Sequence, residues 1–144
     1  MKCKVNWTGQ GGMGFWAHTG SGHAVMMDGP VTEGAPGGGH DMAPRPMEMV
    51  LAGAGGCTAY DVVLILQRGR QQVTGCTVAL QAERADVDPK VFTRINMHYV
   101  VTGKGLSHDV VARAIALSHE KYCSASIMLS KTADITTSFE VVDA

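Results

Sequence analysis

The sequence predicts an α+β protein with antiparallel sheet and segregated helices. The order of the sequence patterns indicates this class. Short segments of alternating apolar and polar residues occur near the start, in the middle and at the end of the 144 residues, and two helical patterns separate them. The length fits one domain over residues 1–144, and a hydrophobic content of 45% is enough to build its core.

Three short strands are predicted to open the chain. Residues 2–8 alternate in polarity, as a half-buried strand does. Residues 15–18 and 23–28 predict two further strands, joined by a Thr-Gly-Ser-Gly turn at 19–22. Together these segments predict a three-stranded meander.

A long glycine- and proline-rich stretch, residues 29–45, has no hydrophobic period and is expected to be a loop. Loops of this length in compact domains are usually functional. Because it leads directly into the next helix, it forms either a lid over Cys57 or a surface excursion, and the sequence leaves both open.

The central helix is predicted to begin at Pro46 and to continue through Gln67. Proline suits a first helical turn, and Glu48 lies near the positive end of the helix dipole. From Met47 to Ala59 almost every residue is apolar or small, which is typical of a buried helix. Glycines in this helix make sense where another backbone or a ligand approaches closely, and Cys57 directly follows them. These glycines are Gly53, Gly55 and Gly56.

The second half predicts two paired strands, two helices and a last strand. Residues 77–83 and 91–101 alternate, and we expect them to pair as antiparallel neighbours. Ser107 is a good N-cap for a helix that ends near Tyr122. Residues 124–131 predict a short helix with Cys123 at or just before its N-terminus, and residues 136–142 predict the closing strand.

The charge and the composition argue against several partners. The net charge is −1 without a basic segment, which argues against nucleic acid and an anionic membrane surface. No signal peptide is visible, and the longest apolar run, Met47–Ala59, is too short to span a bilayer. We therefore expect a soluble cytoplasmic protein. Because the cytosol keeps thiols reduced, the four cysteines are not expected to form a disulfide framework. They include no Cys-x-x-Cys pair, so no zinc module is expected.

Two thiols in or beside helices are the candidate chemical groups. A thiol becomes nucleophilic as a thiolate, which helix N-termini and nearby cations favour. Cys123 has a predicted helix N-terminus beneath it and His119 one turn earlier, whereas Cys57 needs a cation from elsewhere. The candidates are Arg45, Lys121 or a residue of a partner subunit. Taken alone, the pair is either two inert core thiols or a redox pair; Cys3 and Cys76 are expected to be inert.

Two motifs resemble those of the OsmC/Ohr family. The segment Pro-Met-Glu-Met-Val-Leu-Ala-Gly-Ala-Gly-Gly-Cys-Thr-Ala-Tyr-Asp-Val-Val, residues 46–63, is similar to its central-helix motif. The segment Leu-Ser-His-Glu-Lys-Tyr-Cys-Ser-Ala-Ser-Ile, residues 117–127, is similar to its second cysteine motif. The resemblance implies an OsmC-like fold, an intertwined obligate homodimer in which antiparallel sheets surround two long central helices. It most closely matches the family's OsmC-like branch.

The family's characterised members are thiol peroxidases, so the resemblance implies a function for both thiols. Cys57 would be the peroxidatic thiol that attacks an organic hydroperoxide and becomes a sulfenic acid. Cys123 would be the resolving thiol that condenses with it to a disulfide, which an external dithiol then reduces. We expect no cofactor and no metal.

The residues that activate the thiol in peroxidase members are displaced in this chain. Their carboxylate directly follows the helix proline, where this chain has Met47, and Glu48 comes one position later. One residue turns a helix by about 100°, which changes the direction of the side chain. The only arginine before the helix is Arg45. We therefore predict that Arg45 reaches Cys57, steadied by Glu48; the alternative is that Arg45 is a surface residue with no role at the thiol.

Three functions follow from these features. The retained pair of cysteines favours a two-cysteine hydroperoxide reductase. The displaced Glu48 and Arg45 favour a non-enzymatic small-molecule-binding protein that uses its thiols as a redox latch, or a thiol-dependent enzyme acting on another electrophile.

Overall fold

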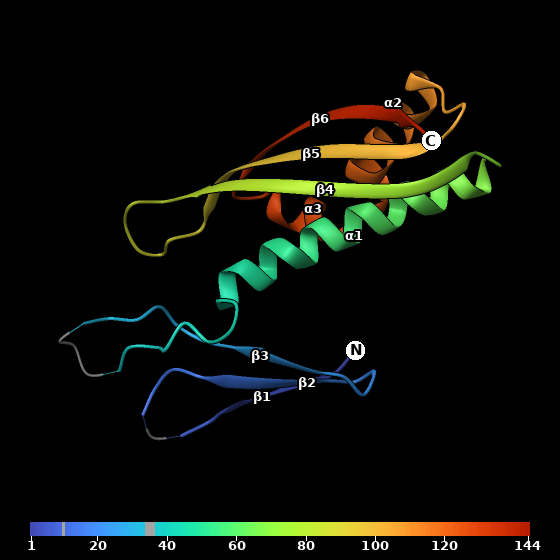
Figure 1. The fold of residues 1–144 in the computed structure, drawn as a ribbon. Helices are drawn as coiled ribbons and strands as arrows, with labels where there is room; N and C mark the ends of the chain where they lie inside the picture. Colours follow the sequence, from blue (N-terminus) through green and yellow to red (C-terminus); the bar gives the residue numbers. More distant parts are fainter. Residues whose placement is uncertain (10, 34–36) are drawn as a thin grey trace. The chain divides into compact units, whose positions relative to one another are not determined.

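A computed structural model describes residues 1–9, 11–33 and 37–144. The chain forms two compact units, residues 1–50 and 51–144. Figure 1 shows their helices and strands, whose order confirms the predicted sequence of elements. The observed helices and strands begin and end within a few residues of the predicted positions. The largest difference is at the start of the fourth strand, which begins earlier than predicted.

The first unit contains the predicted meander. Strands β1 (Cys3–Trp7), β2 (Phe15–Thr19) and β3 (Ala24–Met27) form an antiparallel sheet in the order β1-β2-β3. A short turn joins β2 to β3, where the backbone N–H of Gly22 donates to the carbonyl of Thr19. The predicted three-stranded start of the chain is therefore confirmed.

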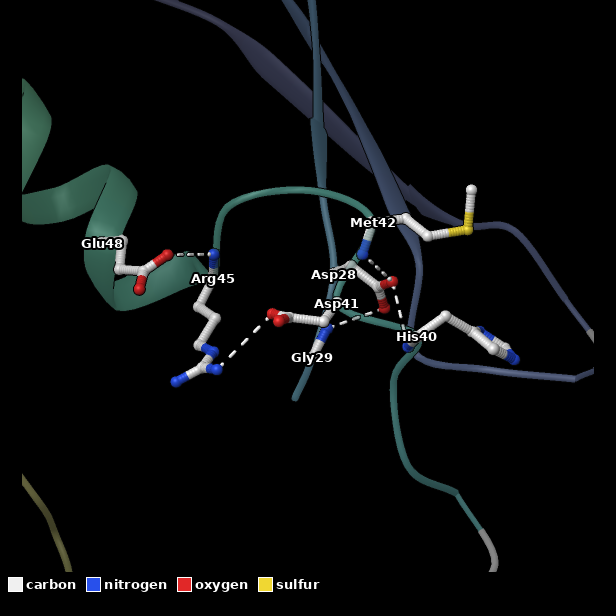
Figure 2. Close-up of polar contacts among 7 residues, drawn as sticks. All are labelled: Asp28, Gly29, His40, Asp41, Met42, Arg45 and Glu48. Atoms are coloured by element: carbon white, nitrogen blue, oxygen red, sulfur yellow. Dashed lines mark hydrogen bonds and ion pairs between the residues drawn. The ribbon is translucent and has the colours of Figure 1, made fainter. Parts of the chain in front are cut away.

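The glycine-rich segment after β3 folds back on a single carboxylate. The Asp28 carboxylate accepts hydrogen bonds from the backbone N–H groups of Gly29, at 2.7 Å, and of His40 and Met42, both at 3.1 Å (Figure 2). These bonds hold the pKa of Asp28 below its usual value, the one from Met42 most of all. A Cβ on Gly39 would overlap the backbone of Gly29, which explains a glycine there. The described part of this segment is thus an ordered loop, and it includes none of residues 34–36, which lie outside the description.

The central helix α1 (Pro46–Arg68) begins at the predicted proline. Glu48 closes its N-terminus, because its carboxylate accepts a 2.9 Å hydrogen bond from the backbone N–H of Arg45. A glutamate at the third helical position that bonds back to the N-cap residue is one half of a capping box. Within the second unit, one stripe of the helix is buried, namely Ala54, Gly55, Thr58, Val62 and Leu66.

The second sheet has the order β4-β5-β6 (Figure 1). Strands β4 (Gln72–Arg84) and β5 (Phe92–Lys104) pair antiparallel, as predicted. Strand β6 (Asp134–Asp143) pairs parallel to β5, so the expectation of a wholly antiparallel sheet is wrong. A parallel pair needs a long crossover, and the helices between β5 and β6 supply it.

This crossover contains three consecutive helical segments. Helix α2 (His108–Leu117) follows the predicted N-cap position, although the Ser107 side chain makes no capping hydrogen bond. A π-helical turn, η1 (Ser118–Tyr122), and helix α3 (Ser124–Leu129) then follow. The core of the unit lies between α1, β5 and the crossover, and its fully buried residues include Ile95, Met97, Tyr99, Val101, Val111 and Cys123.

The other side of α1 remains uncovered by the second unit itself. A Cβ on Gly53 or Gly56 would meet no atom within 4 Å, whereas one on Gly55 would meet Leu80 of β4. Tyr60 is 69% exposed. The expectation that α1 is buried on all faces therefore does not hold within the second unit.

Helix α1 is also long enough to cross a bilayer. One 18-residue window has a mean hydropathy of 1.8, and 28% of it is buried. The shorter run Met47–Ala59 therefore does not exclude a membrane span, because the apolar pattern continues to the end of the helix. The packing of one side of α1 against a sheet is typical of a core helix.

Candidate active site

Helix α1 presents Cys57 and Asp61 one turn apart. Residues four positions apart lie on the same side of a helix, so the two side chains point in the same direction. Both are half-buried, and the fully buried Thr58 lies between them in sequence. The helix therefore holds a thiol and a carboxylate at the edge of the core.

Cys123 caps the short helix α3, as predicted, and is fully buried. Its sulfur accepts hydrogen bonds from the backbone N–H of Ser126, at 3.4 Å, and from the Ser126 hydroxyl, at 3.2 Å. Burial raises the pKa of the Cys123 thiol, and these two bonds only partly oppose the rise. Cys123 is therefore a protonated thiol at neutral pH, which suits a group that reacts second.

The structure brings the two predicted thiols together. Cys57 Sγ, Cys123 Sγ and a carboxylate oxygen of Asp61 all lie within 4.8 Å of one another. A disulfide bond requires the two sulfurs to approach to about 2.05 Å. Cys3, in β1, is exposed, while Cys76, in β4, is half-buried and its thiol pKa is raised by burial.

The same three residues are the described donors that could share a metal ion. Closed structural zinc sites use four protein ligands, and this group offers three. Residue spacing in the sequence cannot reveal such a group, because it forms only when the crossover meets α1. We treat the group as a thiol pair with an adjacent carboxylate.

A chain of buried hydroxyl groups leads away from Asp61. The Ser118 hydroxyl donates to Asp61 Oδ2 at 3.3 Å and lies 2.9 Å from the Thr58 hydroxyl. Thr58 Oγ1 lies 2.7 Å from the Tyr99 hydroxyl, which lies 2.7 Å from His119 Nε2. We call these five residues, Asp61, Ser118, Thr58, Tyr99 and His119, the polar chain.

Two predicted sources of positive charge serve other contacts. His119 bonds to Tyr99, and burial lowers its pKa, so at neutral pH it is no cation for a thiolate. The Lys121 ammonium lies 5.3 Å from the centre of the Tyr122 ring. The π-helical turn η1 widens the helix between Leu117 and Cys123, which changes the side-chain directions expected for a regular helix.

Arg45 and Glu48 make local contacts at the start of α1 (Figure 2). The Arg45 guanidinium lies 3.5 Å from the Asp41 carboxylate, and both side chains are exposed. Glu48 bonds the backbone of Arg45 rather than its guanidinium. The expected pairing of these two side chains is therefore absent, because the carboxylate serves as a helix cap. The predicted action of Arg45 on Cys57 stays a prediction.

The model of the family described as OsmC, OsmC-like protein, matches residues 38–138. The chain belongs to the OsmC-like family. It is 49% identical to Protein YhfA of Escherichia coli K12 over 144 residues, the full length of both chains. Both cysteine motifs lie inside the matched range.

Solved structures of the OsmC-like family share the fold. A hypothetical protein from Aquifex aeolicus VF5 is 24% identical with a TM-score of 0.83, covering 99% of this chain and 96% of that one. An organic hydroperoxide resistance protein from Legionella pneumophila is 16% identical with a TM-score of 0.68, covering 98% of each chain. At these identities the likeness shows the fold alone.

Sequence reasoning missed most of the residues around the thiols in this OsmC-like chain. Asp61 could have been found, because it follows Cys57 by one helical turn. Thr58, Tyr99 and Ser118 carried no signal of their own, since a buried hydroxyl looks like any other core or surface position in a sequence. Only the meeting of α1, β5 and η1 shows that they belong to one chain of hydrogen bonds.

Proposed function

We propose that this protein is a two-cysteine peroxidase that reduces organic hydroperoxides in the cytoplasm. The observation that carries the proposal is the close approach of Cys57, Cys123 and Asp61, supported by the family relationship. The Legionella protein of the same fold is titled as an organic hydroperoxide resistance protein. The expected partners are a hydroperoxide and a dithiol reductant.

The reaction would proceed in two balanced steps. The Cys57 thiolate attacks the terminal peroxide oxygen, the O–O bond breaks, and the products are a sulfenic acid and, after uptake of one proton, an alcohol. The Cys123 thiol then displaces the sulfenic hydroxyl group as water and a disulfide forms. Asp61 has a carboxylate oxygen within 4.8 Å of Cys123 Sγ, and it would pass the thiol proton to the departing hydroxyl. The raised pKa of Cys123 is the reason that a base is needed.

Treatment of the reduced protein with one equivalent of cumene hydroperoxide tests this proposal. We expect an intramolecular Cys57–Cys123 disulfide, which peptide mapping by mass spectrometry detects. Cys3→Ser and Cys76→Ser are the matched controls and should form the same link. A Cys3–Cys76 link, or no link at all, would rule out the two-cysteine mechanism.

A non-enzymatic redox latch is the second candidate function. The contacts of Arg45 with Asp41, and of Glu48 with a backbone N–H, favour it, because neither residue is engaged with a thiol in the described contacts. A latch would form the disulfide slowly and would not turn over with a dithiol reductant. Steady-state consumption of hydroperoxide therefore separates the two functions.

We also propose that the protein is an obligate homodimer. The uncovered side of α1 carries Gly53, Gly56 and Tyr60. Tyr60 also lines a shallow pocket of about 340 Å³, together with Ala59, Val63, Leu64 and Gln67. The glycines allow the backbone of a second helix to approach closely. A second copy would bury this side, with an interface above about 2,000 Å², as permanent complexes have.

A dimer also bears on the predicted role of Glu48. Nine residues of α-helix separate Glu48 from Cys57, a rise of about 13.5 Å, which is longer than a glutamate side chain. Glu48 would thus act on the thiol of a second copy.

Sedimentation tests the dimer. We expect one species of twice the 15.2 kDa chain mass at micromolar concentration. The Tyr60→Asp variant should dissociate, because it places a charge in the apolar interface, whereas the exposed control Lys131→Asp should remain dimeric. A stable folded monomer of the unmodified protein would contradict the proposal, and recovery only in the presence of detergent would point to a membrane instead.

A further inference from the structure

The polar chain has one internally consistent direction of hydrogen bonding. A hydroxyl group has one hydrogen to donate, and an ionised carboxylate can only accept. Ser118 donates to Asp61, so Thr58 must donate to Ser118. Tyr99 must then donate to Thr58.

The last bond of the chain fixes the tautomer of His119. Because the Tyr99 hydrogen is used, the 2.7 Å contact with His119 requires a proton on Nε2. The sulfur of Met97 lies farther from the Tyr99 hydroxyl, at 3.8 Å, and is the weaker acceptor. The hydrogens of the polar chain all point from His119 toward Asp61.

The two ends of the polar chain differ in their surroundings. Thr58, Tyr99 and Ser118 are fully buried, and the Asp61 end lies beside the two thiols. His119 at the other end lines a pocket of about 450 Å³, which Glu120, Ser126 and Asp134 also line. In the part of the chain that is described, no buried side-chain nitrogen or oxygen lacks a partner, so the chain is continuous.

We propose that the polar chain is a proton path from the pocket beside His119 to the thiol pair. A proton enters at His119 Nδ1 and the Nε2 proton moves to the Tyr99 oxygen. Each hydroxyl then passes its own hydrogen onward, until Ser118 protonates Asp61. This proposal rests on the proposed function for its purpose, because reduction of a hydroperoxide leaves an alkoxide that needs one proton.

The electrons and the proton of the first step are all accounted for. Sulfur of the Cys57 thiolate is oxidised by two electrons and the peroxide bond is reduced by the same two. The alkoxide takes the proton from Asp61, which returns to its carboxylate. The hydroxyl groups then rotate back, and His119 returns to the Nε2-protonated tautomer by exchanging its Nδ1 proton with solvent. Delivery through side chains brings the proton to Asp61 through the buried core, beside the half-buried Cys57 on which the sulfenic acid forms. Tyr99 and His119 touch no reacting atom, so they are relay residues.

His119→Gln is the sharpest test of the path. A glutamine amide can still donate to Tyr99, which preserves the fold, but it cannot take up a proton and pass on another. The matched control is His98→Gln, because His98 lies on the same strand as Tyr99 and bonds Ser138 instead. Tyr99→Phe, which removes only the hydroxyl, is the second variant.

The measured quantity is the rate of sulfenic acid formation after mixing with cumene hydroperoxide, in H₂O, D₂O and their mixtures. We expect a curved dependence on the deuterium fraction in the unmodified protein, because several protons move together. His119→Gln and Tyr99→Phe should react about 10- to 100-fold more slowly, at the lower end of acid–base effects, with a linear dependence.

The proton path and the proposed function are tested by different results. An unchanged rate and isotope dependence in His119→Gln overturns the path. A ring of His119 that ¹⁵N NMR shows protonated on Nδ1 in the neutral state overturns it as well. If the unmodified protein does not react with hydroperoxide, the proposed function fails. The NMR tautomer of His119 then still tests the path.

Discussion

Cys57→Ser is expected to abolish hydroperoxide consumption, lowering the steady-state rate by at least about 1,000-fold. A serine hydroxyl cannot form the sulfenic acid on which both steps depend, since the thiolate is the nucleophile. The substitution adds no atoms to a half-buried position, so the fold should be retained. A coupled assay with a dithiol reductant measures the rate, and circular dichroism checks the fold.

Cys123→Ser is expected to block only the second step, the formation of the disulfide. The first step remains, so one equivalent of alcohol should form per chain, and a sulfenic acid on Cys57 should then accumulate. Dimedone labelling with mass spectrometry detects that acid. Sustained turnover by Cys57→Ser would contradict the assignment of Cys57, and sustained turnover by Cys123→Ser would show that an external thiol resolves the sulfenic acid.

Asp61→Asn is expected to slow disulfide formation by about 100-fold or more at neutral pH. An amide has nearly the shape of the carboxylate but cannot accept the Cys123 proton, and a positioned acid–base group contributes 10²–10⁴-fold. The hydrogen bond from Ser118 can still be accepted by the amide oxygen. The rate of the second step, measured by rapid quenching and alkylation, is the quantity to compare.

The pH dependence of this variant provides the control. Burial raises the pKa of Cys123, so the free thiolate becomes populated only above the usual range of a thiol. The rate of Asp61→Asn should therefore rise as the pH increases toward that raised pKa, and the difference from the unmodified protein should shrink. Asp109→Asn, at the start of α2, is the matched variant and should leave the rate unchanged. A neutral-pH rate equal to that of the unmodified protein would remove Asp61 from the mechanism.

Local patterns predicted the elements of this protein well, because most of them depend on neighbouring residues. Pro46 marks the start of α1, and the alternation in residues 91–101 marks β5. The parallel pairing of β6 was predicted incorrectly, because strand direction depends on how the crossover returns and not on the strand itself.

The candidate site was predicted only as far as its motifs extend. The cysteine motifs indicated Cys57 and Cys123, and the structure brings them together. Glu48 has another role in the structure, because it caps the helix, and the expected action of Arg45 on Cys57 stays a prediction. Tyr99 and Ser118 come from elements that meet only in the folded chain, so no spacing rule could place them beside Thr58.

The parallel pairing of β6 with β5 has a consequence for the order of folding. β5 is the middle strand of its sheet, and one of its two neighbours, β6, follows the whole helical crossover. Long-range pairing of this kind is slow, because a large loop must close before any contact forms. Until that loop closes, β5 has only β4 beside it. We therefore expect Cys57 and Cys123 to stay open to alkylation during refolding until β6 pairs, after the faster pairing of β4 with β5.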